Sequence, residues 1–151
     1  MTYTFRMGKL IRIWVKRAHR GPMDPHESGL LVAGAGLEDS ADQGGRRQVT
    51  ILESERWAKM MAELRSDLDP STRRANLLVE GINLIDSRGK TLQIGACTVR
   101  ICGETKPCER MEEALPGLRA SMSAPWNGGA YGEVLTGGPI RVGDEIEWAD
   151  S

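Results

Sequence analysis

The sequence predicts one domain over residues 1–151 that is mostly β with one or two helices (α+β) and folds as an antiparallel, barrel-like sheet. Three observations favour this fold class. A chain of 151 residues can bury one core, whereas two cores of half that size would each be marginal. Several short segments alternate apolar and polar residues, with glycine and proline between them. One segment alone has clear helical periodicity, which argues against alternating βαβ units.

The amino-terminal half begins with a predicted strand at Lys9–Lys16, where side chains alternate with a period of two. Residues 21–36 hold six glycines and prolines, which predicts a loop with room for one strand. Arg47–Leu52 is a short apolar run, after which Ser54 is expected to cap a helix that ends before Pro70. The apolar face of this helix, which we expect to pack on the core, consists of Trp57, Met60, Met61, Leu64 and Leu68.

The second half contains two further predicted strands, Asn76–Leu84 and Leu92–Cys102. In Leu92–Cys102, the alternation predicts that one face of the strand carries Cys97, Val99 and Ile101 and the other face carries Thr98, Arg100 and Cys102. A short helical pattern follows around Met111 to Leu118. Tyr131–Thr136 and Ile140–Trp148 flank Gly137 and Gly138, which predicts a closing hairpin.

Composition narrows the function classes. The formal net charge of -1 argues against nucleic-acid partners, because proteins that bind nucleic acids usually carry an excess of basic residues. No apolar run is long enough to span a membrane, and residues 1–18 lack the pattern of a secretory signal, so we expect a cytoplasmic protein. Three cysteines without an export signal predict free thiols.

Cys108 is the best candidate for chemistry. Pro107 suits the first turn of a helix, which would put Cys108 near its positive end. Lys106 and Arg110 also favour the thiolate, which attacks sulfur or binds a soft metal, while Glu109 opposes them. Local sequence alone leaves an inert thiol as the commoner outcome for a lone cysteine.

Other candidate groups are weaker. His19 and His26 are the two histidines that could serve as a base, and surface positions are the simpler interpretation for both. The pairs Arg46-Arg47 and Arg73-Arg74 offer guanidinium forks that suit planar anions, although solvated surface arginines are commoner.

The order of several landmarks resembles the MOSC family, named for the carboxy-terminal domain of molybdenum-cofactor sulfurase. The matching segments are Gly36-Leu37, Arg47–Leu52, Arg74–Gly81, Leu92–Gly95, Pro107–Met111, Gly129–Leu135, Gly137–Ile140 and Val142–Asp144. One departure is Glu38-Asp39-Ser40, which stands where the family usually has a Gly-Asp pair.

The resemblance implies a compact barrel-like fold in which Cys108 transfers sulfur or ligates molybdenum as a metal ligand. By analogy, Arg47, Arg74 and Asn76 line the same pocket and contact an anionic cofactor. The implied function is binding of molybdenum cofactor (molybdopterin), carriage of sulfur as a Cys108 persulfide, or both. The alternatives are a molybdenum-dependent reductase of N-hydroxylated compounds and a non-catalytic binding module for small anions.

The resemblance also implies partners, either a cysteine desulfurase or an electron-transfer protein. In sulfurases a separate domain carries the pyridoxal-phosphate lysine, and we identify no pyridoxal-phosphate site in this chain. Neither the family nor the residues choose between sulfur transfer and reduction.

Overall fold

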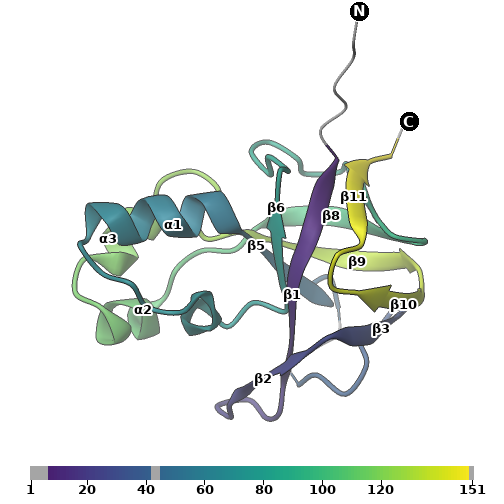
Figure 1. The fold of residues 1–151 in the computed structure, drawn as a ribbon, viewed down its shortest axis with the longest axis horizontal. Helices are drawn as coiled ribbons and strands as arrows, with labels where there is room; N and C mark the ends of the chain where they lie inside the picture. Colours follow the sequence, from purple (N-terminus) through teal and green to yellow (C-terminus); the bar gives the residue numbers. More distant parts are fainter. Residues whose placement is uncertain (1–6, 42–44, 150–151) are drawn as a thin grey trace, which may run out of the picture.

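A closed barrel of seven strands forms the centre of the computed structural model, which describes residues 7–41 and 45–149. The strand order is β1-β11-β7-β8-β9-β5-β6, and β6 returns to β1 (Figure 1). The barrel strands are β1 (Gly8–Lys16), β5 (Val49–Glu53), β6 (Leu77–Glu80), β7 (Thr91–Ile94), β8 (Cys97–Glu104), β9 (Ala130–Thr136) and β11 (Glu145–Trp148). The predicted mostly β, barrel-like fold is therefore confirmed.

Strand pairing in the barrel is antiparallel with one exception, the parallel pair β5 and β6. Strand β2 (Met23–His26) extends the sheet beyond β1. A separate three-stranded sheet has the order β10 (Gly138–Arg141), β3 (Ser28–Val32), β4 (Gly36–Leu37).

Short helices gather on one side of the barrel, at the left in Figure 1. They are α1 (Ser54–Glu63), the 3-10 helix η1 (Pro70–Arg73), α2 (Glu109–Ala114) and α3 (Leu118–Met122). Among the described residues, no helix has both the length and the apolar character that a membrane crossing requires.

Two hydrophobic clusters result from strands that are apolar on both faces. In β5, Ile51 belongs to the cluster inside the barrel, while its neighbour Leu52 packs with the helices. The second cluster consists of Trp14, Leu52, Trp57, Met60, Met61, Ala75, Leu78, Met111, Leu118 and Met122. The predicted Met and Trp stripe of α1 is thus core, and burial fixes the helix against the outside of the barrel.

The boundaries of α1 differ from the prediction. Glu53 occupies the N-cap position and Ser54 is the first helical residue, so the predicted Ser54 cap is wrong. The helix ends at Glu63 because Leu64 leaves helical geometry and Arg65 adopts a left-handed φ of 53°. Leu64 and Leu68 still pack against the helical cluster.

Residues 21–36 contain β2 and β3 and reach the start of β4, where a loop with room for one strand was predicted. Pairing with β1 and β10 organises these segments, although their own alternation is poor. Pro25 is tolerated in β2 because that strand lies at the edge of its sheet.

Two strand predictions in the second half need correction. Leu92–Cys102 is a hairpin of β7 and β8, because Gly95 turns the chain with a φ of 57°. The predicted faces hold within β8, where Cys97, Val99 and Ile101 are buried in the barrel.

The predicted closing hairpin is wrong. Strand β9 pairs with β5 and β8, while β10 pairs with β3. Residues 140–148 also form two strands, separated by a turn at Gly143. Alternation shows that a segment is extended but carries no information about its partner.

Candidate functional site

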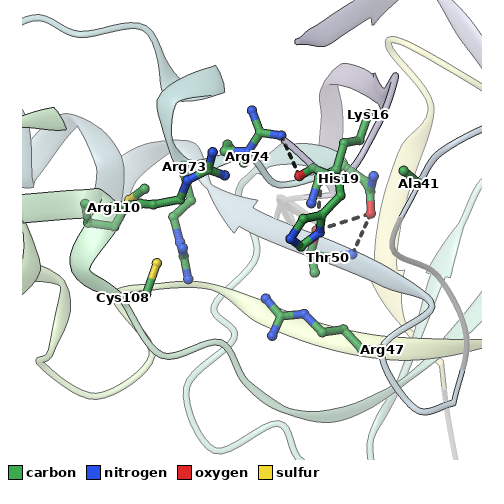
Figure 2. A pocket seen from close by; sticks show the side chains of 11 residues that line it. Lys16, His19, Ala41, Arg47, Thr50, Arg73, Arg74, Cys108 and Arg110 are labelled. Carbon is green, nitrogen blue, oxygen red and sulfur yellow. Dashed lines mark hydrogen bonds between the residues drawn. The ribbon is translucent and has the colours of Figure 1, made fainter. Parts of the chain in front are cut away.

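A pocket of about 380 Å³ opens where the helical side meets the barrel. Its lining residues are Lys16, His19, Ala41, Arg47, Thr50, Arg73, Arg74, Asn76, Cys108, Arg110 and Met111. The four residues singled out in the sequence, Arg47, Arg74, Asn76 and Cys108, all lie here (Figure 2). A volume of this size suits a small molecule.

Cys108 lies exposed at the N-cap of α2, where its carbonyl oxygen accepts a hydrogen bond from the Met111 N–H at 3.0 Å. Pro107 therefore precedes the cap, and the prediction that it lies in the first helical turn is wrong. Lys106 is directed elsewhere, because its Nζ pairs with Glu104 at 3.0 Å. Arg110 is the predicted neighbour of Cys108 that does line the pocket.

Arg73 is buried under the pocket and links two loops. Its Nε donates to the carbonyl oxygen of Gly128 at 2.9 Å, and its Nη2 donates to that of Lys106 at 3.3 Å. Burial, followed by the nearby charge of Arg47, lowers the pKa of Arg73 to about 10, and a thiolate at Cys108 acts in the opposite direction. The charges of Arg47 and of a Cys108 thiolate therefore both act on Arg73.

Asn76 is held in the pocket wall by its own hydrogen bonds. Its Oδ1 accepts from the backbone N–H of Thr50 at 3.0 Å and from the Thr50 hydroxyl at 3.2 Å. Its Nδ2 donates to Ser40 Oγ at 3.1 Å and to the Trp14 carbonyl at 3.4 Å. These bonds give Asn76 a structural role, and its contact with a ligand stays a prediction. Ser40, and not the exposed Asp39, is the residue of the divergent segment that reaches this wall.

Arg74 turns the chain between Arg73 and Asn76. Its φ of 64° lies in the left-handed region, and its N–H donates to Ser71 at 2.9 Å to close η1. Its side chain donates to the carbonyl oxygen of His19 at 3.4 Å. This turn directs two consecutive arginines differently, so that Arg73 is buried beneath the pocket while Arg74 stays partly exposed.

The pocket is strongly cationic. Its charged lining residues are Lys16, Arg47, Arg73, Arg74 and Arg110, and none of the described lining residues is acidic. Figure 2 shows Arg47 reaching toward Cys108 from the opposite side of the pocket, with Lys16 and His19 toward the other end. Positive charge concentrated in a concave space favours an anionic ligand.

Sequence reasoning missed Lys16, noted Arg73 only as part of a basic pair for which a solvated surface position was the commoner outcome, and treated His19 as a surface residue. His19 is exposed and also lines the pocket, whereas His26 does not line it. No local pattern distinguishes Arg73 from the solvated arginines elsewhere in the chain. The density of arginines around residues 73–74 was the available signal.

The other two thiols have different surroundings. Cys97 is in the barrel core, as predicted, and burial followed by the charge of Asp144 raises its pKa. Cys102 lines a second pocket of about 320 Å³ with Arg46, Arg88, Arg100 and Glu133. Burial and Glu133 raise the pKa of Cys102, although Arg46 and Arg100 oppose them.

Metal chemistry at the first pocket would depend on a bound cofactor. Among residues 7–41 and 45–149, no group of three or more His, Cys, Asp or Glu residues could hold a metal ion alone. The exposed Cys108 thiol can supply one soft ligand, and the five cationic side chains can neutralise an anionic group. The donor set fits an anionic cofactor that brings its own metal.

Comparisons with known proteins agree with this fold. The sequence model described as MOSC domain matches residues 17–147. Among solved structures, the YuaD protein from Bacillus subtilis is similar with a TM-score of 0.77 and 18% identity, covering 96% of this chain and 97% of that one.

YiiM from Geobacillus stearothermophilus has a TM-score of 0.77 and 17% identity, with coverage of 95% and 75% of the two chains. YiiM from Escherichia coli has a TM-score of 0.69 and 14% identity, with coverage of 95% and 70%. No curated protein sequence matches the chain. At these identities the structural likeness shows the fold alone.

Proposed function

The chain belongs to the MOSC domain family, which is associated with molybdenum cofactor, and from this premise we propose that its cationic pocket binds that cofactor or its sulfurated form with Cys108 as the reactive group. The single observation that carries the proposal is an exposed thiol in a pocket that also holds five cationic side chains. The cations would bind the anionic part of the ligand, and the thiol would accept sulfur or ligate the metal.

The protein's own residues divide this work. Arg47, Arg74 and Lys16 line the wider pocket and would bind and orient negatively charged oxygens. Arg73 holds the backbone before Cys108, and Asn76 fixes the wall through Thr50 and Ser40. When bound, molybdenum cofactor would supply a soft, redox-active metal centre to which Cys108 could contribute one thiolate ligand.

Sulfur carriage requires a persulfide donor. The Cys108 thiolate attacks the terminal sulfur of the donor R–S–SH, a new S–S bond forms on Cys108, and the donor's S–S bond breaks. The electron pair of the broken bond leaves with the donor as R–S⁻. The terminal S–H proton stays on the transferred sulfur, so no external oxidant or reductant is needed.

The first test is the molybdenum and pterin content of the protein expressed in a host that makes molybdenum cofactor. The native chain is compared with Cys108→Ser and with Cys102→Ser as the matched control. Metal bound by the native chain and by Cys102→Ser, but lost in Cys108→Ser, supports ligation and directs attention to N-hydroxylated substrates. Pterin that persists without metal in Cys108→Ser would assign cofactor binding to the pocket and metal retention to the thiol.

The second test is incubation with a cysteine desulfurase and cysteine, followed by mass spectrometry of the intact chain. One added sulfur on the native protein and on Cys102→Ser, absent from Cys108→Ser, supports the carrier function. Absence of metal, pterin and added sulfur from every form would overturn the proposal. It would leave a non-catalytic anion-binding module that tolerates Cys108→Ser.

A further inference from the structure

The pocket around Cys108 is lined by five cationic side chains, and this charge bears on which sulfur donors could reach the thiol. Resting on the proposed function, we propose that the physiological donor to Cys108 is a small, carboxylate-bearing thiol carrier with net negative charge, presented as its persulfide. Neutral or cationic carriers of the same reactive group would be disfavoured. The proposal concerns the charge and size of the donor, so it can be tested separately from cofactor binding.

The cations line a concave space that also contains the thiol. Arg47 approaches Cys108 across the pocket, and Arg110 is two residues further along the chain in α2 (Figure 2). The pKa of Arg73 responds to the charges of both Arg47 and a Cys108 thiolate, which places these groups within electrostatic range. An anionic carrier entering this space would therefore meet positive charge as its sulfur reaches Cys108.

The volume favours a small carrier. A space of about 380 Å³ can enclose a molecule of small-peptide or metabolite size, and its lining comes from loops, η1, β5 and α2 on several sides. Carboxylates on such a molecule can pair with guanidinium forks while its sulfur faces the exposed thiol. Arg47 is exposed, so it can make this contact without breaking a buried interaction.

Cys102 provides a contrast within the same chain. It also has arginines nearby, but Glu133 lies in its pocket and pairs with Arg100 at 3.0 Å and with Arg46 at 3.9 Å. The positive charge at Cys102 is thus partly neutralised, whereas none of the described residues lining the Cys108 pocket is acidic. Selection for anions should accordingly be stronger at Cys108.

The selecting step can be measured with disulfides of the same carriers. The Cys108 thiolate attacks one sulfur of R–S–S–R, a mixed disulfide Cys108–S–S–R forms, and R–S⁻ leaves with the electron pair of the broken bond. Oxidised glutathione is the net anionic probe and cystamine is the cationic probe. Their persulfides, glutathione persulfide and cysteamine persulfide, probe the transfer of sulfur itself.

The experiment measures the modification rate of each cysteine by peptide mass spectrometry at low ionic strength. The ratio of the oxidised glutathione rate to the cystamine rate is normalised to the same ratio for the urea-unfolded chain, which removes differences in leaving group. We expect a normalised ratio of at least about 10 at Cys108, within the range of electrostatic steering. It should fall toward 1 as salt screens the pocket.

Single substitutions show which arginines cause the preference for the anionic probe. Arg47→Ala and Arg110→Ala should each lower the normalised rate ratio at Cys108 several-fold. Arg119→Ala is the matched control, because Arg119 is an exposed arginine in α3 outside the pocket, and it should leave the ratio unchanged. A ratio near 1 for the native chain, or an equal loss in all three variants, would overturn the proposal.

The outcomes separate this inference from the proposed function. If both persulfides transfer sulfur to Cys108 equally well, sulfur carriage stands and charge selection is wrong. If neither transfers sulfur but the disulfide ratio is high, charge selection by the pocket stands, whereas sulfur donation and the donor assignment fail. A high ratio together with preferred transfer from glutathione persulfide supports both.

Discussion

Arg73 fixes the backbone two residues before Cys108, because its Nη2 donates a hydrogen bond to the carbonyl oxygen of Lys106 at 3.3 Å. The same guanidinium holds Gly128 through Nε at 2.9 Å. One buried side chain thus connects η1 to the loop that presents the thiol and to the loop that precedes β9. This fork therefore ties the thiol-bearing loop to two other parts of the chain.

The first prediction concerns that fork. Arg73→Lys keeps a positive charge but cannot donate to both carbonyls in the same geometry, so it should lower the free energy of unfolding by about 1–3 kcal/mol. Urea unfolding provides the measurement. The exposed Arg119→Lys in α3 is the control and should change stability by less than about 0.5 kcal/mol. Equal stability of Arg73→Lys and the native chain would contradict the role of the fork.

How much of this site could be predicted depends on the residue. The resemblance grouped Arg47, Arg74, Asn76 and Cys108, and the structure places all four in one pocket. Arg73 could not be found in this way, because its burial follows from the left-handed turn at Arg74 and glycine is the usual signal for such a turn.

The fold shows the same division between local and long-range information. Alternation identified β1 and the buried face of β8, since period-two patterns depend on local backbone geometry. The pairing of β10 with β3 in the separate three-stranded sheet joins segments about a hundred residues apart, and it leaves no local pattern in the sequence. The parallel contact of β5 with β6 was missed for the same reason.

The second prediction concerns Cys102. Burial is the largest cause that raises its pKa, and the charge and hydrogen bond of Glu133 raise it further. Glu133→Gln should therefore lower the pKa of Cys102 and speed its alkylation by iodoacetamide near neutral pH, where the thiolate reacts. Arg100→Ala should act in the opposite direction, because Arg100 lowers this pKa.

Rates for both variants can be followed by peptide mass spectrometry as a function of pH, with Cys108 in the same sample as the internal reference. The expected result is a shift of the Cys102 profile to lower pH in Glu133→Gln and to higher pH in Arg100→Ala. Shifts of the same sign in both variants would show that a structural disturbance, and not charge, controls this thiol.

The third prediction concerns the pH dependence of stability. Burial raises the pKa of Glu53 above its usual value of 4.5, although the hydrogen bond and charge of Arg56 and the Leu84 N–H oppose it. Between 4.5 and the raised value the folded state binds more protons than the unfolded state, so this group makes stability fall as pH rises.

Glu53→Gln removes this titration. The difference in unfolding free energy between the native chain and Glu53→Gln should therefore shift against the native chain as pH increases from 4.5, and urea unfolding at several pH values would measure it. Taking the difference cancels the carboxyl groups whose pKa is lowered, Asp69 and Glu104. A difference that is independent of pH would contradict the raised pKa.

The last prediction separates backbone strain from charge at Arg74. A residue with a Cβ at a φ of 64° costs about 1 kcal/mol relative to glycine, so Arg74→Gly should be more stable to urea than Arg74→Ala by about that amount. Both variants remove the same guanidinium from the pocket. They should therefore lower the normalised disulfide ratio of Cys108 to the same extent, which would assign stability to the backbone and anion selection to the side chain. If Arg74→Gly were the less stable variant, the left-handed backbone at residue 74 would not be a source of strain in the native chain.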